Sequence, residues 1–160
     1  MSRIQYSLSQ RVDPLELKEF YDRQHHRTTQ SIEKLSRMIE RSFCLVTAHR
    51  DGELIGLARG VTDGVRGYLT ECKLDPRYQG PAAVTRTDGR IEHDEHGIAR
   101  EMAQRVIEAL RGYGVERIEV LAYGTEVDFC EELGFKRCGG VVALQLEAGS
   151  PVGLQQAVTH

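Results

Sequence analysis

The segment that begins at Gly97 places small residues at the start of a predicted helix, an arrangement suited to binding an anion. Gly97, Ile98 and Ala99 open a stretch in which apolar residues recur with helical spacing. Small side chains leave the backbone N–H groups of the first turn accessible, and the helix dipole favours negative charge at this end. The pattern therefore predicts a helix start that can hold a phosphate group.

A second candidate for chemistry is the tetrapeptide His93-Asp94-Glu95-His96. Two histidines three positions apart, with carboxylates between them, could chelate zinc or nickel. No cysteine or further histidine lies nearby in the sequence to complete such a site. We therefore interpret the tetrapeptide as a solvated loop and expect no metal. The pair His25-His26, which lies in a polar segment that breaks a helical pattern, is interpreted in the same way.

The cysteines give no sign of a metal or redox motif. They are Cys44, Cys72, Cys130 and Cys138, and none forms a Cys-x-x-Cys pair. Two of them lie in apolar runs, where a free thiol usually packs as a small hydrophobic group. We expect reduced and mostly structural cysteines.

The composition is that of an ordinary globular domain. The 160 residues are 40% hydrophobic and 28% charged, with a formal net charge of -3. A chain of this length can bury a core without a metal or a disulfide. No dense block of Lys and Arg suggests nucleic-acid binding, and no apolar run approaches the roughly 18 residues of a membrane span. The N-terminus lacks a secretory signal pattern, so we expect a cytoplasmic protein without nucleic-acid or membrane partners.

The predicted elements form a single α+β domain with a mixed sheet. In chain order they are a strand at 4–8, helices from 14 and at 31–41, strands at 43–48, 54–58 and 68–74, a helix at 97–113, a strand at 115–122, a short helix at 125–133 and a strand at 141–146. Only the strand–helix–strand unit 69–122 must be parallel, because its helix supplies the crossover. The domain is expected to span 1–148, followed by a tail at 149–160.

Three stretches resemble the GNAT acyltransferase superfamily, and together the resemblance covers nearly the whole chain. Residues 69–80 (LTECKLDPRYQG) resemble the family's fourth strand and the start of its phosphate loop. Residues 97–102 (GIAREM) resemble the end of that loop and the helix after it. Residues 128–135 (DFCEELGF) are similar to the family's signature near its fourth helix. The expected fold is therefore the GNAT-like one, a central mixed sheet flanked by helices.

The resemblance implies acetyl-coenzyme A (acetyl-CoA) as the acetyl donor. Its pantetheine arm is expected to pair with backbone groups of the fourth strand, and its pyrophosphate to lie on the loop and the helix start. The implied cofactor-binding residues are Cys72, Lys73, Leu74, Gln79, Gly80, Gly97, Ile98, Ala99 and Arg100.

The phosphate loop departs from the family pattern. Gln79-Gly80 supplies its beginning and Gly97-Ile98-Ala99 its end, but residues 81–96 stand where relatives have a single residue. The insertion either bulges outward, with Asp88-Gly89 as a hairpin turn, or folds across the site and blocks it. Loop-closure entropy opposes the bulge only weakly, whereas acidic groups of the insertion would repel a nearby pyrophosphate.

The resemblance also suggests catalytic residues. Glu71 matches a commonly acidic position, which implies a general base, although an exposed strand residue is the equal alternative. The backbone N–H of Cys72 is the implied oxyanion donor. Cys130 stands where many relatives carry a tyrosine acid, and a small buried residue is the favoured alternative. Tyr21 and Tyr68 are candidates for the acceptor side.

Two functions follow from these features. The first is an N-acetyltransferase that transfers an acetyl group from acetyl-CoA to a primary amine of a small molecule or peptide. The alternative is a non-catalytic GNAT-fold binding or regulatory module with impaired CoA binding, suggested by the split loop and by Cys130. The insertion could also be a substrate lid or a dimer contact. A homodimer is a further expectation, because many relatives are dimers.

Overall fold

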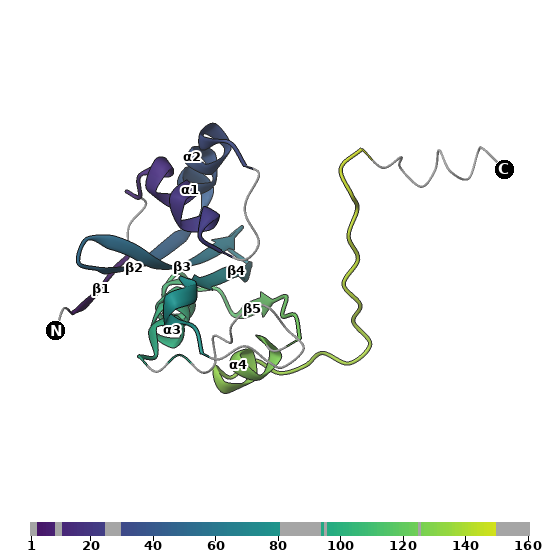
Figure 1. The fold of residues 1–160 in the computed structure, drawn as a ribbon. Helices are drawn as coiled ribbons and strands as arrows, with labels where there is room; N and C mark the ends of the chain where they lie inside the picture. Colours follow the sequence, from purple (N-terminus) through teal and green to yellow (C-terminus); the bar gives the residue numbers. More distant parts are fainter. Residues whose placement is uncertain are drawn as a thin grey trace.

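The computed structural model describes residues 3–8, 11–24, 30–80, 94, 96–124 and 126–149. Within these ranges one five-stranded sheet carries helices on both faces (Figure 1). In chain order the elements are β1 (Ile4–Leu8), α1 (Pro14–Asp22), α2 (Ile32–Arg41), β2 (Cys44–Arg50), β3 (Glu53–Thr62), β4 (Arg66–Leu74), the 3-10 turn η1 (Pro76–Tyr78), α3 (Ile98–Gly112), β5 (Arg117–Val120) and α4 (Glu126–Glu132).

The sheet is mixed, as the sequence predicts. Its strands lie in chain order from β1 to β5, and each of the first four runs antiparallel to its neighbour. Only β5 runs parallel to its neighbour, β4, and α3 supplies the crossover between them. The expectation of an α+β fold with one parallel unit is therefore confirmed.

Local sequence signals fix the ends of several elements. Asp13 caps α1 by accepting a hydrogen bond from the Leu15 N–H at 3.0 Å, and Pro14 occupies the first helical position. Ser31 caps α2 in the same way. At the β2–β3 turn, Asp51 and Gly52 both have positive φ angles, 53° and 78°, as a tight hairpin turn requires.

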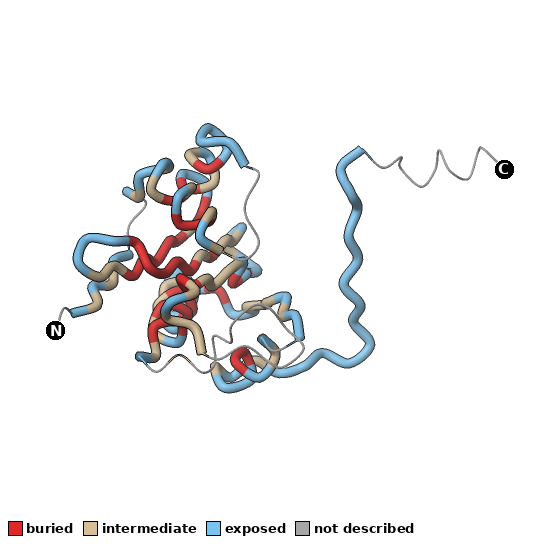
Figure 2. Tube along the Cα trace, viewed as in Figure 1, coloured by how far each residue is buried: buried red, intermediate tan, exposed pale blue. Residues whose placement is uncertain are grey.

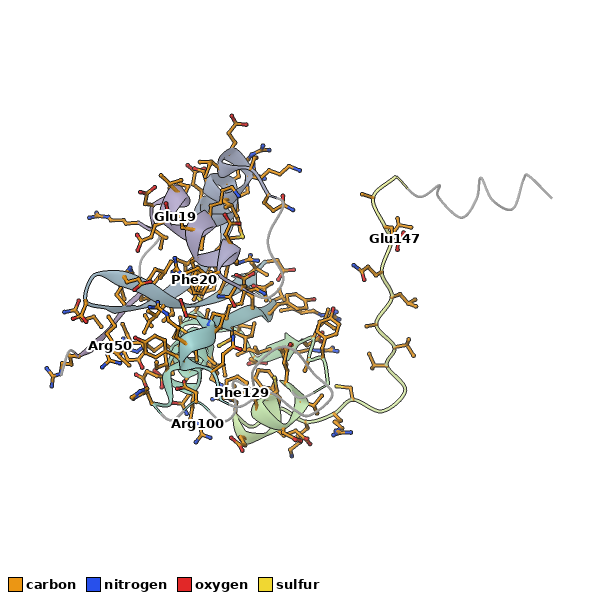
Figure 3. All side chains as sticks on the ribbon, in the orientation of Figure 1. Glu19, Phe20, Arg50, Arg100, Phe129 and Glu147 are labelled. Carbon is orange, nitrogen blue, oxygen red and sulfur yellow. The ribbon has the colours of Figure 1, made fainter. Side chains whose placement is uncertain are left out.

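Two hydrophobic cores lie on opposite faces of the sheet. The first helical pair, α1 and α2, covers one face, and Phe20 points from α1 onto the strands (Figure 3). The other face is covered by α3, whose apolar side is fully buried against β2, β3 and β4. Figure 2 shows the buried residues concentrated along the sheet and these helix faces.

The end of the chain differs from the prediction. Residues 141–146 form no strand; they run extended and exposed beyond α4 (Figures 1 and 2). The prediction of a last strand at 141–146 was therefore wrong. The predicted hairpin turn Asp88-Gly89 and the predicted helix cap Thr125 lie outside the described residues.

Among the helices of the described ranges, none is both long and apolar enough to cross a membrane.

Candidate functional site

The strand β4 extends beyond the end of its parallel partner, β5. The parallel ladder joins Arg66–Leu69 to Arg117–Val120 and ends there. Beyond it β4 continues to Leu74, and this stretch pairs with β3 alone in the described part of the chain. The backbone edge of residues 70–74 that faces away from β3 has no strand partner among the described residues, and the position beside it, beyond the last β4–β5 pair, is here called the gap. An extended chain-like ligand can add to such an edge in the manner of an extra strand.

Strand alternation indicates which backbone groups face this gap. The Asp75 N–H donates to the Ile55 carbonyl at 2.8 Å, so Asp75 faces β3. Backbone groups alternate along a strand, and those of Cys72 and Leu74 are therefore directed to the opposite edge. The carbonyl of Leu74 is already engaged there, because the Gln79 side-chain amide donates to it at 2.7 Å. The Cys72 N–H is left as a donor aimed into the gap.

The first turn of α3 adjoins this part of β4. The thiol of Cys72 contacts the Ala99 carbonyl at 3.4 Å, and both Ile98 and Ala99 are fully buried. Gly97 precedes the helix with a φ of 63° and offers no side-chain cap. The structure thus brings together the two predicted halves of the site, the fourth strand and the start of the following helix.

An acidic side chain from the predicted insertion already occupies this helix start. Asp94 accepts hydrogen bonds from the N–H groups of Ala99 and His96, each at 3.0 Å. A carboxylate is favourable at a helix N-terminus for the same reason that a phosphate is. The end of the insertion therefore places an internal anion where the sequence predicts a bound one. Residues 81–93 and 95, including His93 and Glu95, lie outside the described residues.

The remaining predicted phosphate-loop residues lie around these two elements. Gln79 and Gly80 follow η1 and are half-buried, and Gln79 Oε1 is buried without a hydrogen-bond partner among the described residues. Arg100 lies in the first turn of α3, where its guanidinium pairs with Glu132 of α4 at 2.6 Å. Lys73 is half-buried on β4. Between Gly80 and Gly97, the residues that the structure describes are Asp94 and His96.

On the other face of the sheet, Glu71 is the centre of a polar cluster. The Tyr21 hydroxyl donates to Glu71 Oε1, and Arg59 Nη2 donates to Glu71 Oε2 at 3.3 Å. The Glu71 side chain is only 16% exposed, so it is not a solvent-facing strand residue. Burial, followed by the neighbouring Glu71 carboxylate, raises the pKa of Tyr21 well above its ordinary value. Tyr21 thus stays a protonated donor that holds the carboxylate in place.

Arg59 is a member of this cluster that the sequence did not indicate. Its Nε is buried and has no partner within the described ranges. An arginine opposite a glutamate across a hairpin is a recognisable signal, but here a β-bulge shifts the register between Arg59 and Gly60. Tyr68, the other predicted acceptor-side residue, is 38% exposed on β4, and no hydrogen bond joins it to the cluster in the described part of the chain.

Cys130 lies in the hydrophobic core beside the site. Together with Phe129 it forms the buried side of α4, and its side chain is 5% exposed. Burial, and then the nearby Glu126 carboxylate, raises the pKa of its thiol to about 11. Burial likewise raises the pKa of Cys72, helped by the Cys130 thiol. Cys130 is therefore protonated at neutral pH, a state that suits both a proton donor and a buried packing residue.

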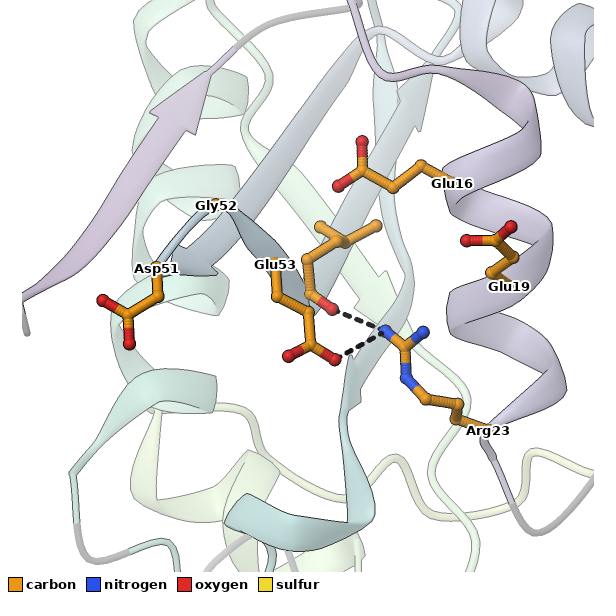
Figure 4. Close-up of a pocket in the computed structure, with 7 residues that line it drawn as sticks. Glu16, Glu19, Arg23, Asp51, Gly52 and Glu53 are labelled. Atoms are coloured by element: carbon orange, nitrogen blue, oxygen red, sulfur yellow. Dashed lines mark hydrogen bonds and ion pairs between the residues drawn. The ribbon is translucent and has the colours of Figure 1, made fainter.

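An open hollow lies apart from the gap, between α1 and the β2–β3 turn (Figure 4). It has a volume of about 330 Å³ and is rimmed by the carboxylates of Glu16, Glu19, Asp51 and Glu53. Arg23 lies within it, donating to the Leu54 carbonyl at 2.8 Å and pairing with Asp75 at 3.0 Å. These contacts tie α1 to the start of β3 and the end of β4. No group of three metal-binding side chains is found among the described residues.

Comparison with known proteins places this arrangement in a known fold. No protein-family model matches the sequence, and no curated protein matches it. Solved structures do match. A GNAT family acetyltransferase from Streptococcus pneumoniae superposes with a TM-score of 0.67 at 18% identity, over 91% of this chain and 100% of its own. The chain has the GNAT acetyltransferase fold.

Two further structures with this fold agree. A putative acetyltransferase from Deinococcus radiodurans has a TM-score of 0.65 at 23% identity, over 93% of this chain and 94% of its own. An aminoglycoside N-acetyltransferase in complex with CoA has a TM-score of 0.67 at 12% identity, over 92% of this chain and 97% of its own. At these identities the likeness establishes the GNAT fold, and the chemistry must be argued from this chain's own residues.

Proposed function

We propose that this protein is an N-acetyltransferase that transfers an acetyl group from acetyl-CoA to a primary amine of a small molecule or peptide. The observation that carries the proposal is the open edge of β4 beside the first turn of α3, within a GNAT fold. A pantetheine arm is an extended, amide-bearing chain, so the free strand edge at residues 72–74 offers it suitable partners. The helix start offers N–H groups to its phosphates.

At the strand, the Cys72 N–H is directed away from β3, and we expect it to donate to the thioester carbonyl and stabilise negative charge on that oxygen. The Leu74 carbonyl on the same edge is already engaged by Gln79. At the helix, the Ala99 N–H is held by Asp94. A phosphate must share this helix start with the carboxylate or displace it.

Bound acetyl-CoA would supply the acetyl thioester. Side chains of this protein would accept the proton of the amine and donate a proton to the leaving thiolate. The amine must lose a proton to become a nucleophile, and Glu71 is placed to accept it, directly or through a water molecule. Tyr21 and Arg59 hold the Glu71 carboxylate from two sides. As the C–N bond forms and the C–S bond breaks, the leaving thiolate needs a proton, and the protonated Cys130 is the candidate donor on the chain.

A thermal-shift measurement with acetyl-CoA tests the proposal first. Ligand at about 100 times its dissociation constant adds about 2.7 kcal/mol, which corresponds to several degrees for a domain of this size. We expect such a shift, followed by release of free CoA thiol when an active amine is supplied. Absence of any shift up to millimolar acetyl-CoA would contradict the proposal.

A second function is favoured by one observation, the occupation of the helix start by Asp94. A GNAT-fold module that does not bind CoA could keep such an internal anion permanently, because nothing would have to displace it. This module would serve in binding or regulation. Turnover with any amine acceptor would exclude it, whereas an unchanged melting temperature with acetyl-CoA would support it.

A further inference from the structure

The ammonium group of Lys73 has no hydrogen-bond or ion-pair partner among the described residues. Lys73 lies on β4, two residues after Glu71, and it is half-buried. A charge that is withdrawn from water is costly unless an opposite charge pairs with it. The ammonium group therefore marks a place in the molecule where an anion can bind.

Lys73 lies on the same face of the sheet as Glu71. Side chains alternate along a strand, and the two neighbours of Lys73, Cys72 and Leu74, contact the core beneath α3. The register partner of Lys73 is Leu57 of β3, which belongs to the other core, beneath α1 and α2. The Lys73 side chain therefore lies on the α1 face, opposite the start of α3, where the phosphates of acetyl-CoA are proposed to bind.

A second cation on this face is only partly paired. Arg59 donates through Nη2 to Glu71 at 3.3 Å, but its Nε is buried and has no partner within the described ranges. The side chains of Arg59 and Glu71 are 17% and 16% exposed, so water screens their charges poorly. Lys73, Arg59 and Glu71 together carry one positive charge in excess.

The acidic hollow does not neutralise this excess charge. Its carboxylates lie on α1 and at the β2–β3 turn, where Glu53 pairs with Arg77 at 2.7 Å and Glu16 contacts His49 at 3.1 Å. No ion pair joins the hollow to Lys73 in the described part of the chain. The positive charge beside Glu71 is therefore left for a ligand.

We propose that the acceptor is an α-amino acid, whose amino group binds beside Glu71 and whose carboxylate binds Lys73. The inference rests on the proposed function and narrows its acceptor. Alternate residues of a strand lie about 6.6 Å apart, and the flexible stem of lysine shortens the distance between the two charges, so a small molecule can contact both. A zwitterion matches the site in both signs, whereas Lys73 and Arg59 would repel a polycationic amine.

The reaction would yield an N-acetyl amino acid. The acceptor gives up one proton to become a neutral amine and a second proton as its nitrogen forms the C–N bond, and Glu71 accepts them in turn and passes them on. The C–S bond of acetyl-CoA breaks, and the leaving thiolate takes up one proton. One proton is thus released to solvent for each N-acetyl amino acid and each CoA thiol formed.

Matched acceptors test the role of the carboxylate. Each of a panel of common L-amino acids is assayed with acetyl-CoA beside its carboxamide and its decarboxylated amine, by the release of CoA thiol. We expect at least one amino acid to have a kcat/KM about tenfold or more above both of its analogues, because the analogues lose a hydrogen bond between charged groups. A polyamine should be a poorer acceptor than that amino acid.

A variant of Lys73 tests which side chain reads the carboxylate. Lys73→Met keeps most of the length and removes the charge, so we expect kcat/KM for the preferred amino acid to fall by about tenfold to a hundredfold, mainly through KM. The kcat/KM for the carboxamide and the KM for acetyl-CoA should stay within about twofold. Lys73→Arg should keep most of the preference. The matched control is Lys34→Met on the exposed side of α2, which should change none of these values.

Other outcomes overturn the inference and differ from a failure of the proposed function. If no amine releases CoA thiol, the function and the inference fail together. If carboxamides or polyamines react as well as the amino acids, the protein is an acetyltransferase but its acceptor is not an amino acid; carboxamides resemble the N-terminus of a peptide and would point to peptide acceptors. Loss of acetyl-CoA binding in Lys73→Met would assign Lys73 to the cofactor. The comparison of acceptors needs only the parent chain, so it decides the matter even if a variant fails to fold.

Discussion

Glu71 is the side chain on which the proposed chemistry depends most, because both of its carboxylate oxygens are already committed. Tyr21 holds one oxygen and Arg59 the other. This double hold fixes the carboxylate on the α1 face of β4, while the Cys72 N–H is directed into the edge gap. The proposed base, Glu71, and the proposed oxyanion donor, Cys72, are therefore consecutive residues of one strand. Their relative positions are set by the strand itself.

Replacing Glu71 separates its chemical role from its structural one. Glu71→Gln keeps the shape and an acceptor for Tyr21 but removes the basic carboxylate. Since general-base catalysis contributes about 100-fold or more, we expect turnover to fall by at least that factor while the acetyl-CoA thermal shift is retained. The control is Glu108→Gln, on the exposed side of α3. Turnover of the Glu71 variant within twofold of the parent would remove Glu71 from the mechanism.

Asp94 is the second residue whose role can be measured directly. In the proposed function its carboxylate would compete with a phosphate for the start of α3, and a charge at a helix terminus contributes about 0.3–1 kcal/mol. We expect Asp94→Ala to tighten CoA binding by about two- to fivefold, measured by calorimetric titration. Asp94→Asn keeps the hydrogen-bond acceptor without the charge, so it should give a smaller gain. Weaker binding in both variants would instead show that Asp94 helps to form the phosphate site.

The elements of the fold follow closely from local sequence signals. Caps at Asp13 and Ser31, the Asp51-Gly52 turn and the apolar periodicity of α3 act over short distances, so they can be predicted from one sequence. The strand at 141–146 could not be assigned correctly, because propensity favours a strand without naming its partner. In the structure that run has no partner within its own sheet.

In the candidate site, too, features made of consecutive residues could be predicted from the sequence, and contacts between distant residues could not. The open strand edge and the helix start were predictable from the resemblance, since both are stretches of consecutive residues. The pairing of Arg59 with Glu71 was not. Counting back from the observed pair of Thr62 with Gly67 places Arg59 opposite Thr70, and a bulge moves it opposite Glu71. The role of Asp94 was hidden because its carboxylate reaches five residues forward to Ala99.

At the end of β4, Asp75 joins several elements through one buried carboxylate. It is 1% exposed, and it accepts hydrogen bonds from the guanidinium groups of Arg23 and Arg77 at 3.0 Å each. Burial alone would raise the pKa of Asp75, but the hydrogen bonds from Arg77 and Arg23 outweigh it and lower the pKa below its ordinary value. At pH values above the ordinary pKa of an aspartate, the Asp75 carboxylate therefore contributes fully to stability. This contribution is lost as the pH falls through the lowered pKa of the folded state.

Neutralising Asp75 tests this connection. Because hydrogen bonds to a charged group are lost, we expect Asp75→Asn to reduce the free energy of unfolding by about 1.5–3 kcal/mol at pH 7. The difference between parent and variant should persist down to about pH 4 and shrink below it, as the parent's carboxylate takes up its proton. Urea unfolding at several pH values measures this. Glu40→Gln, which neutralises an exposed carboxylate of α2, should show neither effect.

At the scale of the whole molecule, α3 packs against β2, β3 and β4, and its first turn contacts Cys72 of β4. Glycines on β3 and β4 allow the helix to lie close. A Cβ added at Gly60 of β3 would lie 2.8 Å from Val106 Cγ1 of α3, and one at Gly67 of β4 would lie 3.2 Å from Leu110 Cδ2 of α3. Valine is stiff at its first side-chain torsion, so the contact with Val106 cannot be relieved by a simple rotation. The helix itself would have to move away from the sheet.

Gly60→Ala therefore tests whether the close approach matters to both stability and the site. Overpacking of this kind costs about 1–3 kcal/mol, so we expect a loss of that size in urea unfolding. Because α3 carries its N–H groups to the gap, we also expect weaker CoA binding. The matched control is Gly112→Ala at the end of α3, where an added Cβ meets nothing within 4 Å. There the change should be neutral or stabilising by up to about 1 kcal/mol, since alanine favours the helix. Equal effects of the two substitutions would show that the sheet yields to the added methyl group, and that the position of α3 is not fixed by Gly60.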